Sequence, residues 1–260
     1  MIDDTACPTA RGMCLFLADY GAALLGSGAT CIRLEKNIDR IAATYGMHAE
    51  MTIMPRHLHL TVRRDDSDEI FTATTTVRTS CISFNVNTEL SRLSWEIADR
   101  RIGWADVDGR YRTIVKDIPQ NPWAVLALVT AANASFCRLF DGDGIAMLVV
   151  AVATMAGYYL KQQLLGRHVD VRVTFMICAF VSSVLGATDM LFGMGSTPAV
   201  AIGTSVLYLV PGIPFLNSFS DLLYRHYICS FGRFIDAMVL TACLSIGLCG
   251  GMLMMHAGMF

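Results

Sequence analysis

The sequence lacks the short motifs with which most enzymes bind cofactors or activate substrates. It contains no CxxC pair, no glycine-rich phosphate loop, no GxSxG turn and no HExxH helix. We therefore predict neither an enzyme nor an ATP-driven pump, and we expect no cofactor. His57 and His59 fall on one face of an expected strand, but two histidines without a third ligand indicate a surface role and no metal site.

The sequence has no excess of positive or negative charge, and charged residues of both signs are scarce in the second half of the chain. The 20 Lys and Arg residues nearly balance the 22 Asp and Glu residues, so no broad basic surface exists and we expect no nucleic-acid partner. Only twelve of these residues follow Asn121. With 54% hydrophobic residues and a mean hydropathy of +0.49, the composition predicts an integral membrane protein.

Paired cysteines are also missing, although the chain has nine cysteines. They are scattered singly, and several fall within apolar runs, where a free cysteine behaves as a small hydrophobic side chain. This distribution predicts a reducing cytosol and buried free thiols, and it argues against a disulfide framework. The nine are Cys7, Cys14, Cys31, Cys81, Cys137, Cys178, Cys229, Cys243 and Cys249.

The spacing of apolar residues in the first 120 residues predicts a small α+β domain. Apolar residues at intervals of three and four over residues 15–45 predict one long amphipathic helix that ends at Gly46. Alternating apolar positions between residues 51 and 77 predict about three strands. A second helical stripe covers residues 86–97, with Asn87 or Thr88 as its cap, and a third helix is expected over residues 106–116.

Five uncharged apolar stretches in the rest of the chain predict about five membrane helices. Crossing the hydrocarbon takes roughly 20 apolar residues, with a tolerance of a few. Pro119 and Pro122 mark the boundary, and Trp123 supplies an interfacial aromatic side chain. We thus predict a cytoplasmic domain over residues 1–120 and a transmembrane helical domain over residues 121–260. The stretches are residues 122–137, 144–160, 173–188, 190–220 and 237–255.

Basic residues predict which ends of these helices face the cytoplasm. Lys161, Arg167 and Arg172 lie in one loop and Arg225 and Arg233 in another, whereas the turn over residues 193–198 has none. Because positive loops stay inside, five spans place both basic loops and the N-terminal domain in the cytoplasm, and the C-terminus outside. A cleaved leader is not expected, because acidic side chains precede and interrupt the apolar run of residues 13–25.

The strongest functional signal lies where two prolines flank a glycine, at residues 211–214. Prolines remove backbone donors and unwind a helix, which membrane depth tolerates where protein or a water-filled cavity receives the freed carbonyls. Broken helices of this kind build binding sites in transporters. The candidate substrate-pathway residues are therefore Pro211, Gly212, Pro214, Asn217 and Asp221. The alternative is a helix that simply ends at the cytoplasmic interface, with its polar residues in solvent.

Two further polar residues fall at or within other apolar stretches. Asp189 follows the third stretch, where an ionised carboxylate costs at least about 2.5 kcal/mol unless it is paired or hydrated. We predict that Asp189 or Asp221 carries a coupling proton, and a position of Asp189 at the outer interface is the alternative. Asn133 is a candidate for orienting a substrate, although a hydrogen bond between helices is the favoured interpretation.

Small residues four positions apart predict close helix packing, within the chain or between subunits. These pairs are Ala153 with Gly157, Ser182 with Gly186, and Gly247 with Gly251.

Two parts of the chain resemble the threonine/serine exporter family. Residues 24–35, LLGSGATCIRLE, followed by IAATYG at residues 41–46, look like the family's opening signature, and so does Pro211-Gly212 with Asn217 and Asp221. The resemblance covers roughly residues 13–255. Because family members occur as long fused chains or as two subunits, and this chain contains only the first half, it resembles the larger subunit of the two-subunit type, similar to the pair implicated in succinate export.

These observations predict one subunit of an inner-membrane exporter for small carboxylate metabolites. The resemblance implies succinate or a similar dicarboxylate, with threonine or serine as the alternative, and a hetero-oligomer with a small all-helical membrane subunit. We expect half-helix ends around Pro211 and Gly212 to offer backbone amides to the carboxylate, with Asn217 orienting it. Two other classes stay open, a membrane-anchored sensor or scaffold and a membrane-embedded enzyme.

Overall fold

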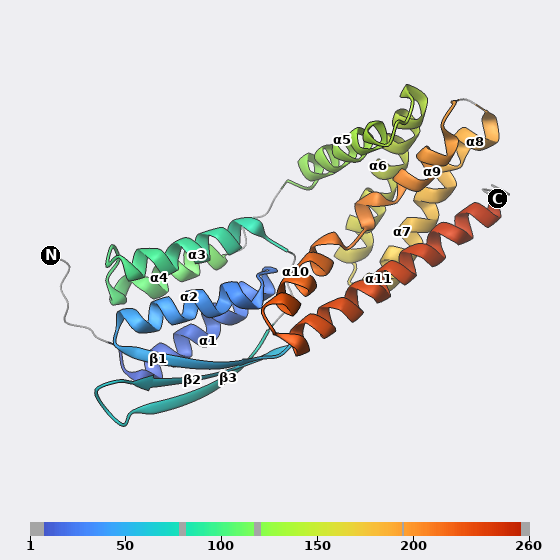
Figure 1. Ribbon diagram of the computed structural model, residues 1–260. Helices are drawn as coiled ribbons and strands as arrows, with labels where there is room; N and C mark the ends of the chain where they lie inside the picture. Colours follow the sequence, from blue (N-terminus) through green and yellow to red (C-terminus); the bar gives the residue numbers. More distant parts are fainter. Residues whose placement is uncertain (1–7, 78–81, 117–120, 194, 256–260) are drawn as a thin grey trace. The chain divides into compact units, whose positions relative to one another are not determined.

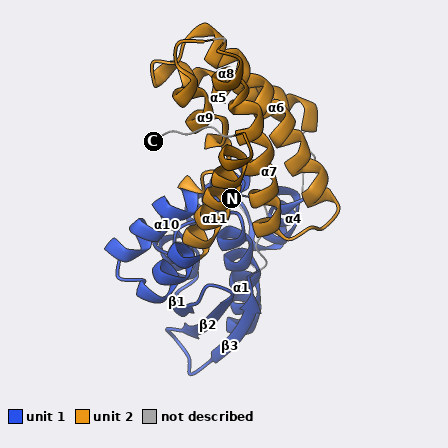
Figure 2. Cartoon of the chain, turned by 90° about the vertical axis from the view of Figure 1, so that its right-hand side faces the viewer, with its two compact units in different colours: residues 1–118, 213–235 blue, residues 119–212, 236–260 orange. Residues whose placement is uncertain are grey.

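The computed structural model describes residues 8–77, 82–116, 121–193 and 195–255 (Figure 1). Their secondary structure is mostly helical, with one small sheet. The chain forms two units that are interleaved in sequence (Figure 2). Unit 1 contains Met1–Ile118 and Ile213–Ile235, and unit 2 contains Pro119–Gly212 and Asp236–Phe260. The boundary proline Pro119 and the cysteines Cys7 and Cys81 lie outside the described residues.

The sheet of unit 1 confirms the three predicted strands. β1 (Met47–Ile53), β2 (His57–Arg64) and β3 (Ile70–Thr76) pair antiparallel in the order β1-β2-β3. The apolar side chains of the central strand, Leu58, Leu60 and Val62, are fully buried. Alternation along a strand sends them to one face of the sheet, where α1 (Ala10–Gly26) covers β2 and β3.

The single long helix predicted over residues 15–45 is wrong, because the structure has two helices there. α1 ends at Gly26, and α2 (Cys31–Thr44) begins after a short loop. Gly28 in that loop has a φ of +91°, a left-handed conformation that glycine adopts readily and a helix does not contain. The apolar stripe continues through the loop, and for this reason periodicity alone did not reveal the break.

Two more helices complete the N-terminal part of unit 1. α3 (Phe84–Ala98) matches the second predicted stripe, but the predicted caps are wrong, because the hydroxyl of Ser83 accepts from the Val86 amide. α4 (Trp104–Val115) matches the third. α2 packs against α3 and β1, so these elements enclose one hydrophobic core between the sheet and the helices.

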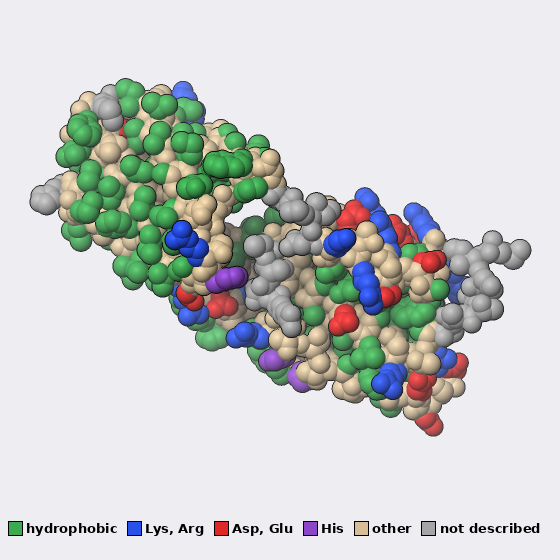
Figure 3. Space-filling view, turned by 180° about the vertical axis from the view of Figure 1, so that it is seen from behind, with side chains coloured by type: hydrophobic (Ala, Val, Ile, Leu, Met, Phe, Trp, Pro, Cys, Tyr) green, Lys and Arg blue, Asp and Glu red, His purple; other side chains and the backbone are tan. Residues whose placement is uncertain are grey.

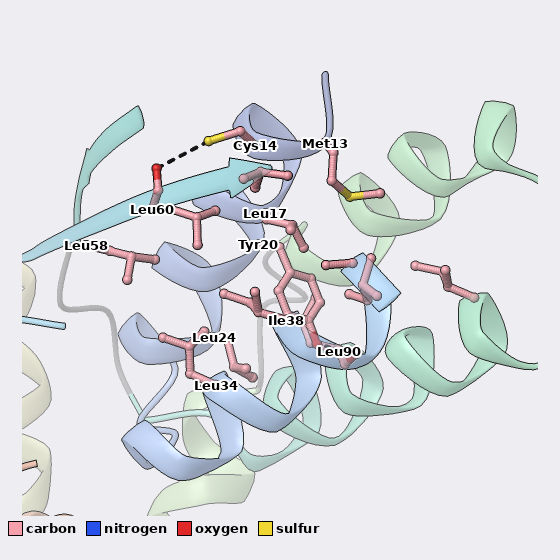
Figure 4. Packing of buried hydrophobic residues seen from close by; sticks show 14 of the residues in the cluster. Met13, Cys14, Leu17, Tyr20, Leu24, Leu34, Ile38, Leu58, Leu60 and Leu90 are labelled. Atoms are coloured by element: carbon pink, nitrogen blue, oxygen red, sulfur yellow. Dashed lines mark hydrogen bonds between the residues drawn. The ribbon is translucent and has the colours of Figure 1, made fainter. Parts of the chain in front are cut away.

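Tyr20 is the largest fully buried side chain of this core (Figure 4), and it is also hydrogen-bonded. Its hydroxyl donates to the Leu90 carbonyl at 2.8 Å and accepts from the Asn37 amide at 3.0 Å. Burial raises the pKa of Tyr20, so the phenol stays protonated. One side chain therefore joins α1, α2 and α3 inside an otherwise apolar cluster.

We expect Tyr20→Phe to destabilise unit 1 by about 1–3 kcal/mol, because it removes the hydroxyl that binds both the buried Leu90 carbonyl and the buried Asn37 amide. The matched control is Tyr111→Phe, since the Tyr111 hydroxyl donates to the Asp19 carbonyl at an exposed position. Thermal melting of the purified chain in detergent measures both. Equal midpoints for the two variants would contradict the role of the buried network.

Most of the helices that are long and apolar enough to cross a membrane lie in unit 2, whereas α10 and the start of α11 belong to unit 1. α5 (Pro122–Leu139), α6 (Gly144–Gly166), the pair α7 (Val171–Gly186) and α8 (Thr188–Phe192), and α11 (Tyr227–Met254) meet this test within the described residues. α9 (Pro198–Ser205) with η1 (Leu207–Leu209) and α10 (Gly212–Leu223) meet it together as one bent pair. Four to five spans result, in agreement with the predicted number.

The surface of these helices is apolar where a soluble protein would be charged. Leu128 is 70% exposed and Leu148 is 67% exposed. Figure 3 shows hydrophobic side chains gathered over unit 2, whereas acidic and basic side chains gather over unit 1. Exposed apolar helices of this length indicate that hydrocarbon is the solvent of unit 2.

The predicted small-residue pairs are packing positions within the chain. Gly157 on α6 faces Ser182 and Tyr208, and Gly186 on α7 faces Ser205 on α9. On α11, a Cβ atom on Gly247 would meet the Met176 carbonyl of α7, and a Cβ atom on Gly251 would meet the Phe180 carbonyl and the side chain of Ser183. Small residues thus allow α6, α7, α9 and α11 to approach at backbone distance, as is typical of membrane helices.

The seven described cysteines are all free thiols, and five of them are buried. The prediction of buried free thiols is confirmed for these five. Cys243 is half-buried and Cys249 is exposed on α11.

Candidate functional site

The predicted break in the helix lies at Val210 and Pro211. η1 ends at Leu209, Val210 is extended with a φ of −60° and a ψ of 123°, and α10 begins at Gly212. Pro214 is the third residue of α10, in the first turn, where backbone amides have no acceptor within the helix. Pro211 therefore separates two helices, and Pro214 is accommodated without breaking the second one.

Asn217 and Asp221 lie one turn apart on α10, and within unit 1 they bind the loop between α1 and α2. The side-chain amide of Asn217 donates to the Gly28 carbonyl at 2.8 Å. The carboxylate of Asp221 accepts from the Cys31 amide at 2.8 Å, at the N-terminus of α2, where a negative charge is stabilised by the helix dipole. Asp221 is completely buried, so it is not a solvent-exposed residue at a helix end.

Arg233 on α11 completes this set of contacts. Its guanidinium forms an ion pair with Asp221, with 3.0 Å between Nη1 and Oδ2, and it donates to the Ala29 carbonyl at 2.8 Å. We call Asn217, Asp221 and Arg233, bound to residues 28–31, the loop clamp. A buried carboxylate is stable only when its charge is compensated, and Arg233 provides the compensation. The sequence analysis used Arg233 only as one of the basic residues that indicate which loops face the cytoplasm.

Further contacts hold α10 and the start of α11 within unit 1. The hydroxyls of Ser218 and Ser230 each donate to the other residue's carbonyl, at 2.8 and 2.9 Å, and so join the two helices. The Cys229 thiol donates to the Ile53 carbonyl at 3.3 Å, at the end of β1. A side-chain hydrogen bond to Cys229, together with burial, raises the pKa of Cys31, so that thiol stays protonated and unreactive.

Asn133 forms a polar junction between three helices of unit 2. Its side-chain amide donates to the Thr154 hydroxyl at 2.6 Å and to the Thr204 carbonyl at 3.0 Å. The side chain is almost entirely buried. These contacts join α5, α6 and α9, so the predicted hydrogen bonding between helices is confirmed, and a role toward substrate stays a prediction.

A cavity of about 410 Å³ lies beside this junction. A volume of this size falls in the range of small-molecule pockets, roughly 300–1,000 Å³. Its lining is mostly apolar and aromatic, with Asn133 and the hydroxyl of Tyr208 among the polar groups, and it includes η1, which directly precedes Pro211. The lining residues are Val129, Ala132, Asn133, Phe136, Phe140, Tyr158, Leu207 and Tyr208.

Asp189 lies on the short helix α8 and is completely buried. One carboxylate oxygen accepts from the Gly195 amide at 2.7 Å. Its other oxygen has no hydrogen-bond partner among the described residues. Nearby, Asp143 caps α6, and the backbone amides of Ala146 and Ser196 that donate to its carboxylate hold its pKa below the usual range. The sequence analysis did not select Asp143, although an aspartate just before an apolar helix is a recognisable cap.

The structure thus distributes the predicted residues over the two units. Asn217 and Asp221 belong to unit 1, whereas Asn133, Asp189 and Pro211 belong to unit 2. The partners that sequence reasoning missed are Thr154, Thr204 and Arg233. Each is distant in sequence from the residue that it contacts, and no local pattern connects them.

Apolar helices packed through glycines, a helix broken at Pro211 and a pocket-sized cavity define a multi-pass membrane protein. The chain belongs to the threonine/serine exporter family, because the model of that family matches residues 15–255, nearly the whole chain. The class of protein is therefore a transporter.

Two curated proteins are similar to this chain over most of its length. A Klebsiella aerogenes protein named "Probable succinate transporter subunit YjjP" is 29% identical over 244 residues, which cover 93% of this chain and 92% of the relative. An Escherichia coli K12 protein of the same name is 26% identical over 229 residues, covering 87% and 88%. No solved structure matches the chain.

Proposed function

We propose that this chain is one subunit of an inner-membrane exporter of succinate or a similar dicarboxylate. The observation that carries the proposal is the near full-length similarity to two proteins named as succinate transporter subunits, within a family of exporters. The apolar helices of unit 2 support a membrane location. Residues 1–120 then lie in the cytoplasm, with the basic loops on the same side.

The word subunit in the relatives' names supports a partner chain. We infer a small all-helical membrane protein of the same family, which supplies the second membrane half that fused members carry in one chain. The chain and this partner together form the transport path. Export without the partner would contradict this part of the proposal.

The substrate pathway passes the cavity beside Asn133. Its volume accommodates a four-carbon diacid, and Asn133 and the Tyr208 hydroxyl are polar groups within its mostly apolar lining. Pro211 and Gly212 follow the cavity-lining η1 directly in the chain, and the start of α10 is a helix N-terminus of the kind that attracts a carboxylate. Asn217 and Asp221, the other pathway candidates, act through the loop clamp.

The variant Asn133→Ala tests the substrate pathway, because we expect it to change efflux strongly and stability only slightly. We expect efflux to fall at least about tenfold, the range for loss of one well-placed polar contact to substrate, while stability changes by only about 0.6 kcal/mol, the average for hydrogen bonds between membrane helices. The matched control is Ser135→Ala, whose hydroxyl is exposed and bonds within its own helix to Ala131. Unchanged efflux in the Asn133 variant would remove Asn133 from the pathway.

The experiment that tests the function is efflux of labelled succinate from proteoliposomes that contain the chain with and without its small partner. We expect efflux only with both chains, accelerated by an imposed pH gradient, because Asp189 or Asp221 carries the coupling proton in this proposal. Absence of flux from correctly inserted protein would instead support the sensor or scaffold.

The second candidate substrate is threonine or serine, and the name of the matching family favours it. The same proteoliposomes loaded with labelled threonine and serine decide between the two. Partner-dependent efflux of an amino acid, with no efflux of succinate, would replace the first proposal by the second.

A further inference from the structure

Asp189 carries a buried carboxylate oxygen whose hydrogen-bonding capacity is unused. The side chain has no exposed surface, Oδ1 is bound by the Gly195 amide, and Oδ2 has no hydrogen-bond partner among the described residues. A buried charged oxygen in this position is unfavourable unless a proton or an ion satisfies it. Asp189 therefore offers a buried acceptor to a proton or a cation.

A second carboxylate is held in place next to it. Asp143 accepts from the Ala146 amide at 2.7 Å, from the Ser196 amide at 2.6 Å and from the Ser196 hydroxyl at 2.9 Å. These donors favour the ionised form and fix its orientation. Asp143 is thus a preorganised negative charge.

The two carboxylates converge on one point beside Gly195. A Cβ atom on Gly195 would lie 2.9 Å from each oxygen of Asp189 and 3.0 Å from Oδ2 of Asp143. Three carboxylate oxygens therefore border a space that stays open because residue 195 has no side chain. Oxygen atoms of this kind are the preferred ligands of hard cations.

No basic side chain of the described residues around α8 is placed to neutralise the pair. α8 packs against α6, α7 and α9, and α9 has no charged residue. Lys161 on α6 lies roughly 27 Å along the helix from Asp143, and Arg172 and the cap Asp170 lie at the far end of α7. In the α5–α6 turn, Arg138 donates to the Gly142 carbonyl and Asp141 is exposed.

We infer that Asp189 and Asp143 bind one monovalent cation, a proton or a sodium ion, beside Gly195. A proton on Asp189 would turn its unused acceptor into a donor, and two neighbouring carboxylates share a proton because their charges repel. A sodium ion would be bound by the same three oxygens. That this cation drives export rests on the proposed function, whereas its binding does not.

The test measures binding without any transport. The melting midpoint of the purified full-length chain is recorded in detergent while choline is replaced by sodium at constant ionic strength, and separately over a series of pH values. A ligand that binds only the folded protein raises the midpoint. We expect the wild type to respond to one of the two cations, and we expect Asp189→Asn to lose that response. A sodium response identifies sodium, and a pH response lost in the variant identifies the proton.

Two more variants keep the inference testable if Asp189→Asn does not fold. Gly195→Ala retains both carboxylates but fills the space between them, and it should lose the same response. Asp141→Asn, an exposed carboxylate in the neighbouring turn, should keep it. A wild type that responds to neither cation, or variants at residues 189 and 195 that respond as the wild type does, would overturn the inference. Because no substrate is present, this outcome is independent of whether the protein exports succinate.

Discussion

Asp221→Asn is expected to destabilise the loop clamp by about 3–5 kcal/mol, the range for removing one partner of a buried ion pair. The substitution leaves the Arg233 guanidinium without its counter-charge and weakens the bond to the Cys31 amide. The effect can be measured directly as the hydrogen-exchange rate of the backbone amides in the peptide that covers residues 28–35. Exchange there should accelerate by about two to three and a half orders of magnitude, since 1.4 kcal/mol corresponds to a factor of ten.

The double variant Asp221→Asn with Arg233→Gln tests whether the pair acts as a unit. Removing both charges should restore part of the protection, because no uncompensated charge remains buried. Asp236→Asn is the matched control, since Asp236 is an exposed aspartate of α11. If the single variant exchanges no faster than this control, the ion pair does not stabilise the loop.

Gly247→Ala is expected to separate α7 and α11 and to destabilise unit 2 by about 1–3 kcal/mol or more, the range for overpacking. The added methyl group would meet the Met176 carbonyl, and it would lie 2.9 Å from Cβ of Ala179 and 3.0 Å from the Phe180 amide. Backbone atoms do not move aside as a flexible side chain does, so the helices must shift. Thermal melting in detergent and abundance in the membrane measure the effect.

Gly250→Ala provides the matched control on the same helix. A Cβ there would meet only the ring of Phe180, at 3.5 Å, which is ordinary van der Waals contact. This variant should melt at or slightly above the wild-type midpoint, because alanine favours a helix more than glycine does. Equal losses for Gly247→Ala and Gly250→Ala would show that the close backbone contacts of Gly247 do not explain its loss.

The sequence predicted those features of the fold that depend on local pattern. Alternation located the strand with Leu58, Leu60 and Val62, because one face of β2 is buried. The absence of charge located the membrane helices, because hydrocarbon excludes charged side chains from long stretches. The prolines located the break at Val210 and Pro211, because proline lacks the amide that a helix needs.

The features that the sequence did not reveal depend on contacts between distant residues. The attachment of residues 213–235 to unit 1 depends on Asp221, Arg233 and the loop near Cys31, which are separated by as many as 204 positions in the Arg233–Ala29 contact. The convergence of Asp143 and Asp189 depends on a turn that returns Gly195 to the start of α6. A pattern confined to one helix contains no information about either.

The interleaving of the two units determines the order in which the protein can mature. A ribosome finishes residues 1–118 first, yet unit 1 also requires Ile213–Ile235, which emerge only after α5 to α9 have been made. At about 5–20 residues per second, roughly 6–23 seconds pass between the synthesis of residue 118 and that of residue 235, and until then Cys31, Gly28 and Ala29 lack their partners from α10 and α11. The complete N-terminal unit can therefore form only after the membrane helices α5 to α9 have been synthesised, and a nascent chain stalled before residue 235 lacks part of unit 1.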